Sequence, residues 1–435
     1  MRSARREGFR ARGLLALAVL AWFAIALWNS VKPLPPGTHV ASLSSRLAES
    51  EVLIIHDSSE RRELRSRELS AIDEAEQLIV LDELALERAL AERLLTRKRQ
   101  RPNIRIVVVS DPADSAHGGT PAGTLDALER AGIIVARARL TRLRDPSALY
   151  SALWRLSVGW WSDPFDESTD PAGVRSWLRS LNHKADHRQL IAADDGSGGW
   201  RCLLPASADG DLAVEISGAL AREVVASELS IAAWSTDDDR LPPTPPIPAR
   251  GLGSIDARFL TEGAIRAALL DALAASGAQD EIHLSARLLS ERAVIAAALR
   301  AERRGAHLSV LLDPGSSPNP AVAGELMSEG DGRIEVRWLA PAKADTSVSM
   351  AIFRHRNERL CIVGAADLTR PSLEDYNLEA AVELRAPERA QAARALDEYF
   401  DAKWTAALRY PRHADESRAA YWRYRALEVG GFATF

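Results

Sequence analysis

Apolar and polar positions along the chain follow a pattern that predicts strand–helix–strand units. Residues 78–84 are strand-like, and residues 104–112 are a β-branched run. They flank a helical segment with a charged outer face at 87–100. The same pattern returns roughly two hundred residues later, over 282–288, 291–304 and 307–314. In both copies the last strand ends in Asp-Pro. Units of this kind imply parallel or mixed sheets with helices on both faces, so we predict an α/β protein built from two similar halves.

The segments outside these units suggest how the chain is divided. An acidic and proline-rich stretch at 236–254 has few backbone donors and is typical of an extended connector. We therefore expect a first half over 50–235 and a second half, ending in a C-terminal helix, over 255–435. Residues 32–49 are expected to be a linker that follows the N-terminal segment 1–31.

The N-terminal segment predicts a membrane anchor. Arginines crowd the first twelve residues, and an uncharged apolar run follows from Gly13 to Trp28. This run is close to the short end of the roughly 17–25 residues that span a bilayer. Arginines stay on the cytoplasmic side, so we predict a single-pass protein of the inner (cytoplasmic) membrane whose main domain is exported to the periplasmic side. The alternative is a cleaved signal peptide, because Ala24-Ile25-Ala26 has the small-x-small form, and that too would export the domain.

Composition narrows the chemistry. The 435 residues are 46% hydrophobic and 26% charged, which is enough for two globular cores. A net charge of -5, without a long basic block, gives no reason to expect nucleic acid as a partner. The nine histidines are scattered outside any metal-binding spacing, and two cysteines cannot form a disulfide framework or a cysteine metal site. We therefore predict neither a metal nor a cofactor.

Residues 187–194 carry the most informative motif. His187, Gln189 and Asp194 stand at the spacing of the HxKxxxxD motif, and the segment resembles the first catalytic motif of the phospholipase D superfamily with its lysine replaced by Gln189. Residues 364–370 resemble the family's Gly-Ser-Ala-Asn-Leu-Thr-Arg with Asp367 in place of asparagine, and Asp209 holds the matching place in the first half. The overall pattern is similar to membrane-anchored, cardiolipin-synthase-like members. The resemblance implies two pseudo-symmetric α/β/α halves with mixed sheets.

The second copy of the motif departs further from the family. Counting back from residue 364, the family's His-x-Lys falls on Ser347 and Ser349, and its aspartate falls on Arg354. In the family one histidine attacks phosphorus, while the other protonates the leaving alcohol and then activates the incoming one. The lysines, with serine and asparagine side chains, hold the non-bridging oxygens. The resemblance therefore implies that one histidine, both lysines and both asparagines are missing here.

These losses predict a catalytically impaired pseudoenzyme. Removing a general acid costs about 10²–10⁴-fold, and removing one electrostatic donor costs about 10²–10³-fold. Aspartates in place of asparagines should also repel a phosphodiester. We expect His187 to be a relict nucleophile, with Asp194 and Glu379 as its catalytic companions. The relict cleft could still bind a phospholipid headgroup or another phosphodiester, and candidate contacts are His183, Arg188 and Asn377.

Two alternatives remain at this point. One is an active phosphatidyltransferase or phosphodiesterase that uses His187 as nucleophile and a substitute acid. His355 is a poor substitute, because the polar residues 354–359 between two apolar runs predict a hairpin turn away from the site. The other alternative is a structural subunit that assembles with an active relative as its protein partner.

The two cysteines occupy near-equivalent strands of the two halves. An exported location would permit a disulfide between Cys202 and Cys361. Buried free thiols are the alternative that we favour, because cysteines in central strands behave as small apolar residues.

Overall fold

A computed structural model describes residues 2–56, 62–111, 120, 122–157, 184–206, 211–247, 251–316, 318–340, 348–413 and 417–429. Three of the positions singled out above, His183, Asp209 and Ser347, lie outside these ranges.

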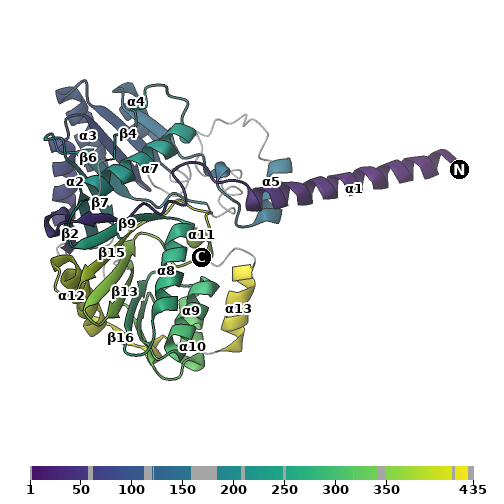
Figure 1. Cartoon of the computed structure of the whole chain (residues 1–435). Coiled ribbons are helices and arrows are strands. Elements are labelled where there is room, and N and C mark those ends of the chain that lie inside the picture. The colour runs from purple at the N-terminus through teal and green to yellow at the C-terminus, as the bar shows by residue number, and fades with distance from the viewer. Residues whose placement is uncertain are drawn as a thin grey trace.

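Two mixed sheets with the same strand order form the body of the molecule (Figure 1). The first runs β2-β8-β7-β6-β3-β4-β5, and the second runs β9-β15-β14-β13-β10-β11-β12, with β1 and β16 added at its two edges. The strands of the first sheet are β2 (Val52–His56), β3 (Leu78–Glu83), β4 (Arg105–Ser110), β5 (Ile134–Arg137), β6 (Leu190–Asp194), β7 (Trp200–Pro205) and β8 (Leu212–Ser217). Those of the second are β1 (Ser45–Leu47), β9 (Ile255–Thr261), β10 (Glu281–Ala286), β11 (His307–Leu312), β12 (Ile334–Trp338), β13 (Ser349–His355), β14 (Glu358–Gly364), β15 (Ala380–Pro387) and β16 (Leu408–Arg409). The predicted fold class, a duplicated α/β fold with mixed sheets, is confirmed.

Both predicted strand–helix–strand units are present. Strands β3 and β4 pair in parallel, as do β10 and β11. The helices are α1 (Arg2–Val31), α2 (Arg62–Glu74), α3 (Arg88–Gln100), α4 (Ala122–Arg130), α5 (Ala148–Ser157), α7 (Ala219–Ser235), α8 (Gly263–Ala275), α9 (Arg292–Arg303), α10 (Asn319–Glu329), α11 (Arg370–Leu373), α12 (Gln391–Ala406) and α13 (Arg418–Val429). Short 3₁₀ turns lie at Glu49–Glu51, Leu140–Arg142 and Tyr410–Arg412.

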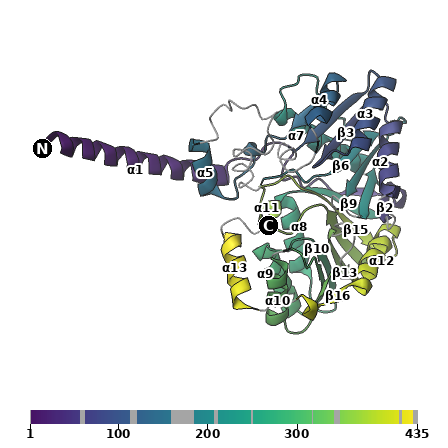
Figure 2. The same cartoon turned by 180° about the vertical axis from the view of Figure 1, so that it is seen from behind.

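Alternation along the strands divides the interior into three cores. In β3, Val80 faces a central core between the sheets, whereas Leu81 faces an outer core under α2 and α3. In β13, Ile352 faces the central core and Phe353 faces an outer core under α8, α9 and α10. The central core also takes side chains from α7 and α12, and both views of the ribbon show these helices beside the two sheets (Figures 1 and 2). Because strands with two buried faces carry continuous apolar runs, the sequence shows them clearly.

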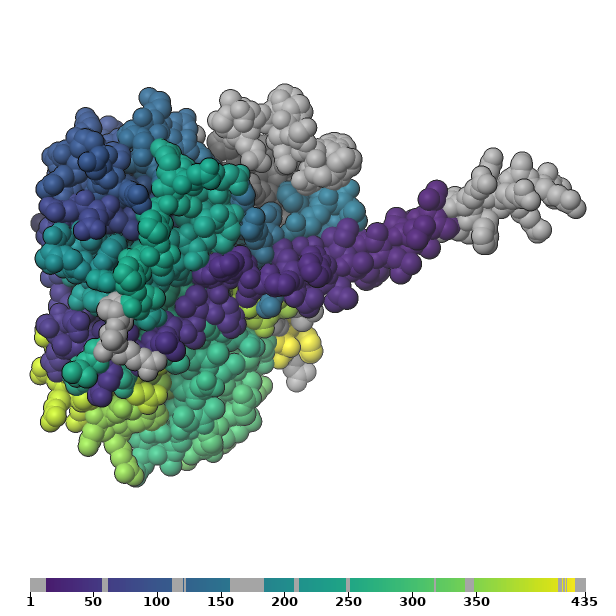
Figure 3. Space-filling view, turned by 45° about the horizontal axis from the view of Figure 1, so that its top comes forward, coloured from purple at the N-terminus to yellow at the C-terminus, as the bar shows by residue number. Residues whose placement is uncertain are grey.

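Helix α1 projects away from the body (Figures 1, 2 and 3). By length and composition, its Gly13–Val31 segment is a candidate membrane span. The segment after it does not hang free, because β1 pairs antiparallel with β9, and Ala41 forms a bridge with Leu260. Residues expected to form a linker therefore supply an edge strand to the sheet of the opposite half.

Equivalent strands of the two halves hold the two cysteines. Cys202 in β7 pairs with Ala192 of β6, and Cys361 in β14 pairs with Ile352 of β13. Both are buried free thiols. Strand pairing therefore makes Ala192 of the first half equivalent to Ile352 of the second. This equivalence aligns the two motif copies in the same way as the sequence comparison does.

Candidate functional site

The segment that carries His187 joins the two halves of the molecule. Asp186 forms a parallel bridge with Leu378, the amide of His187 donates to the Leu378 carbonyl at 2.8 Å, and Leu378 donates to the Ala185 carbonyl at 3.0 Å. Asn377 adds its side-chain oxygen, which accepts the Ala185 amide at 3.1 Å. Three pairings thus fix the start of β6 against the start of β15. Asn377, proposed above as a ligand contact, has the contacts of a residue that positions the histidine segment.

His187 and Glu379 form the centre of the site. The imidazole Nδ1 lies 2.9 Å from Oε1 of Glu379, so its N–H donates to that carboxylate. The Glu379 side chain is fully buried, whereas 25% of the His187 side chain is exposed. A second contact fixes the glutamate, because its backbone amide donates to Glu262 Oε1 at 3.0 Å. Nδ1 is therefore occupied, and Nε2 is the nitrogen available to a ligand.

Electrostatics make His187 a cation at neutral pH. Burial lowers the pKa of the imidazole, but the charge and the hydrogen bond of Glu379 outweigh burial. Asp367 and Asp111 add to the negative field, and the pKa of His187 rises to about 9. Nε2 then carries a proton, which suits it to bind an anionic oxygen. That proton must leave before Nε2 could attack phosphorus.

Asp367 is paired with an arginine that the sequence did not reveal. Its buried carboxylate follows β14 and accepts a hydrogen bond from the guanidinium of Arg287, which follows β10. Burial raises the pKa of Asp367, while Arg287 and His187 act in the opposite direction. The Arg287 side chain is 41% exposed. The repulsion expected from an aspartate at this place is thus offset by a cation beside it. In the sequence, the only sign of this arginine was a charged residue directly after an apolar strand.

Asp194, expected from the sequence to be a catalytic companion, has the contacts of a structural residue. It ends β6 at the edge opposite His187. Its carboxylate accepts the backbone amides of Glu76, Gln77 and Leu78 at 3.0, 2.8 and 2.8 Å. These bonds satisfy the turn that leads into β3. The motif spacing identified Asp194 in the sequence, but it could not show which groups its carboxylate would bind.

Arg188, predicted from the sequence as a possible ligand contact, likewise has the contacts of a structural residue. Its side chain is fully buried. It donates to Glu262 Oε1 at 2.7 and 3.0 Å and to Glu228 Oε1 at 2.8 Å. It also donates to the Gly37 carbonyl at 2.8 Å. Arg188 therefore ties the segment after α1 to α7 and to the residue that precedes α8.

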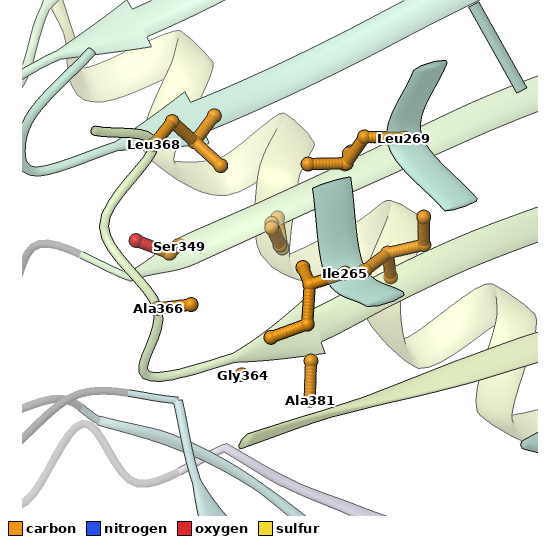
Figure 4. A pocket seen from close by; sticks show the side chains of 10 residues that line it. Ile265, Leu269, Ser349, Gly364, Ala366, Leu368 and Ala381 are labelled. Carbon is orange, nitrogen blue, oxygen red and sulfur yellow. The ribbon is translucent and has the colours of Figure 1, made fainter. Parts of the chain in front are cut away.

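Two of the described degenerate motif positions, Gln189 and Ser349, are buried. Gln189 is buried and has a positive φ of 21°. Ser349 begins β13 and lines a small, mostly apolar pocket with Ile265, Leu269 and Leu368 (Figure 4). The pocket volume is about 20 Å³, room for about one water molecule.

His355 does not approach His187. The predicted hairpin is present, with His355 pairing with Glu358 at the turn between β13 and β14. Its Nδ1 lies 2.9 Å from Asp280 Oδ1. Ser349 starts the same strand, and its seven residues span about 20 Å at ~3.3 Å per residue. His355 therefore lies at the far edge of the sheet from the motif position. Within the described ranges, no group of three or more His, Cys, Asp or Glu is arranged to hold a metal ion.

The two halves use equivalent carboxylates differently. Cys202 pairs with Ile216 and Cys361 pairs with Leu384, so the residues five places before these partners, Asp211 and Glu379, are equivalent. Glu379 holds His187. Asp211 instead accepts hydrogen bonds from two side chains of α12, the Tyr399 hydroxyl at 2.6 Å and Lys403 Nζ at 2.7 Å. The pseudo-symmetry of the fold is therefore broken at the site.

Comparison with known proteins agrees with this architecture. Residues 272–404 match the family described as cardiolipin synthase, PLD-like domain. This part of the chain, in the second half, is therefore similar to phospholipase D-like domains. Among solved structures, phosphatidylserine synthase from Haemophilus influenzae Rd KW20 is similar in fold, with a TM-score of 0.59 and 9% identity over 94% of this chain and 98% of that one. Nuc from Salmonella typhimurium matches at a TM-score of 0.30 and 16% identity, over 35% of this chain and 98% of its own. No curated protein sequence matches the chain.

Proposed function

We propose that this protein is a membrane-anchored, catalytically impaired member of the phospholipase D superfamily that binds a phosphodiester headgroup at His187. The observation that carries the proposal is the asymmetry of the two equivalent carboxylates. Glu379 still holds an imidazole, whereas Asp211 is bound to Tyr399 and Lys403. One half of the site keeps its histidine and its orienting group. In the other half Ser347 stands at the histidine position, and the equivalent carboxylate is bound elsewhere.

A site with one imidazole lacks an acid for the leaving group. Attack by Nε2 on phosphorus would break the bond to the leaving oxygen, and that alkoxide must take a proton. In a two-histidine site the second imidazole supplies it, a contribution of about 10²–10⁴-fold. Here Ser347 holds that sequence position, and the substitute considered from the sequence, His355, is bound to Asp280 at the far edge of the sheet. Slow or absent turnover follows.

Binding does not need the missing groups. A protonated His187 donates from Nε2, and Arg287 adds an exposed cation next to Asp367. Hydrogen bonds between charged partners are the strong ones, so two cationic donors suit the anionic oxygens of a phosphodiester. The candidate span in α1 would keep the site at the membrane, where phospholipid headgroups are concentrated. The arginines before the span favour an exported position for the main domain.

The test compares turnover and binding in the full-length protein reconstituted in phospholipid vesicles. We expect wild-type protein to release no more headgroup than His187→Gln, while ³¹P NMR shows glycerophosphodiester binding that His187→Gln abolishes. His355→Gln is the matched control, because His355 has the same 25% side-chain exposure and the same 2.9 Å contact to a carboxylate. It should leave binding unchanged.

The runner-up is an active phosphatidyltransferase or phosphodiesterase that uses His187 as its nucleophile, and the intact His187–Glu379 pair favours it. Wild-type turnover that disappears in His187→Gln but not in His355→Gln would establish this alternative and overturn impairment. Gain of activity in a variant with Ser347→His, Ser349→Lys and Gln189→Lys would show that the scaffold lacks only these side chains. A structural role beside an active relative predicts copurification from membranes and no binding of the phosphodiester.

A further inference from the structure

We infer that α5 is a second membrane-contacting element, which enters the bilayer beside the anchor. The inference rests on the proposed insertion of α1 and goes beyond it, because α5 belongs to the globular half of the chain. Three observations support it: the apolar surface of α5, its contact with α1, and the position of the charged groups around it.

The outward face of α5 is apolar. Leu149, Leu153 and Leu156 are 48%, 54% and 42% exposed, and their spacing places them on one side of the helix. Arg155 is the only charged residue of α5, and it pairs with the buried Asp145 at 3.1 Å. Most of the other exposed large apolar side chains among the described residues belong to α1. An apolar patch of this kind on a water-facing surface marks a binding site.

Direct contact between α5 and α1 joins the exposed apolar surface of α5 to the candidate span. Helices α1 and α5 pack together, and α5 lies alongside the body-proximal end of α1 in both ribbon views (Figures 1 and 2). The indole N–H of Trp22 donates to the Leu149 carbonyl at 2.8 Å. Trp22 lies nine residues before Val31, the end of the span. That is about 13 Å along a helix, close to the middle of a hydrocarbon core ~30 Å thick.

Charged groups near α5 gather at the level where the span ends. The Asp145 amide donates to the Asn29 carbonyl at 3.0 Å, and Lys32 Nζ donates to the Thr141 carbonyl at 2.6 Å. Asp145 also pairs with Lys184. The chain therefore passes from a polar cluster beside Asn29 and Lys32 to an apolar helix beside Trp22. This order matches the passage from headgroups into acyl chains, so lipid is the occupant that fits the exposed leucines.

Site-directed fluorescence in vesicles tests the inference. An environment-sensitive dye is attached to one introduced cysteine at a time, made by Leu153→Cys in α5, Leu20→Cys in α1 or Met327→Cys in α10. Met327 is the matched control, because it is a partly exposed apolar residue on a helix remote from α1 (Figure 1). Unsubstituted protein gives the blank, since Cys202 and Cys361 are buried. The full-length variants are reconstituted in phosphatidylcholine vesicles, with and without a lipid that carries a mid-chain nitroxide.

We expect the nitroxide lipid to quench the dyes at positions 153 and 20 several-fold more than the dye at 327, and aqueous iodide to show the reverse order. Iodide quenching at 153 equal to that at 327, with 20 still quenched by lipid, would overturn the inference and leave the anchor standing. Iodide access at all three positions would refute both the membrane insertion of α1 and the inference about α5. Shielding of 153 from both quenchers would show that protein covers α5, which also refutes a lipid contact.

Discussion

His187 and Glu379 are 192 residues apart in the sequence, yet Nδ1 of one lies 2.9 Å from Oε1 of the other. His187 lies three residues before the start of β6 in one sheet, and Glu379 lies directly before β15 in the other. Because the pairing of residues 185–187 with 377–378 fixes this contact, the site depends on the correct docking of the two halves. The contact also sets the charge of the imidazole, from which the first prediction follows.

Substitution of Glu379→Gln should lower the pKa of His187 from about 9 towards the ordinary value near 6.5, because the amide carries no charge. The raised pKa stabilises the folded protein fully below about pH 6.5, and that contribution is lost as pH rises through about 9. The substitution should remove it. Histidine NMR during a pH titration measures the pKa, and unfolding measured at several pH values gives the stability. Asp280→Asn, which removes the partner of His355, should leave the titration of His187 where it was.

Binding of a glycerophosphodiester should be constant at neutral pH and weaken as pH rises through about 9, where Nε2 loses its proton. Titration calorimetry at several pH values checks this, with His187→Gln as the baseline. Binding that strengthens as the imidazole becomes neutral would contradict a cationic anchor for the phosphate.

Asp194→Ala should destabilise the fold by about 3 kcal/mol, since the loss leaves several backbone donors unsatisfied near β3. Asp194→Asn should cost less, because its carbonyl oxygen still accepts. Thermal melting in detergent compares the two. A melt of Asp194→Ala equal to wild type would show that the turn before β3 does not need this carboxylate.

Arg188→Met should be more damaging, by about 3–5 kcal/mol, because it leaves buried carboxylates at Glu228 and Glu262 without their cation. Arg188→Lys should recover only part of the loss, since a single ammonium cannot reproduce the forked contacts. The same substitution at the exposed Arg300 of α9 is the control and should not change the melting temperature. Unchanged stability in Arg188→Met would contradict a structural role.

Restoring the second half of the site should require freeing Asp211. In the variant with Ser347→His, Ser349→Lys and Gln189→Lys, further changes of Tyr399→Phe and Lys403→Met should increase headgroup release several-fold. They remove the two hydrogen bonds that hold the Asp211 carboxylate, which could then orient the new imidazole. Tyr399→Phe with Lys403→Met in the wild-type background is the control and should release nothing. An unchanged rate in the combined variant would show that Asp211 does not limit the restored site.

The sequence by itself determined the local architecture. Runs such as 104–112 and 307–314, with helices before them, predicted two parallel pairs because apolar periodicity is a property of neighbouring residues. Motif spacing also located His187, and the apolar run after the arginines predicted the candidate span. Both depend only on the order of residues along the chain.

Only the tertiary structure decided which charges meet. It paired Glu379 with His187, Arg287 with Asp367, and Asp211 with α12, and it buried Arg188 and Asp194 in structural roles. It also placed β1 on the sheet of the opposite half. These contacts join residues that are far apart in sequence, and the docking of two sheets around one core selects them. Periodicity reports which face of a strand is buried, but it carries no record of the partner that a buried charge will find.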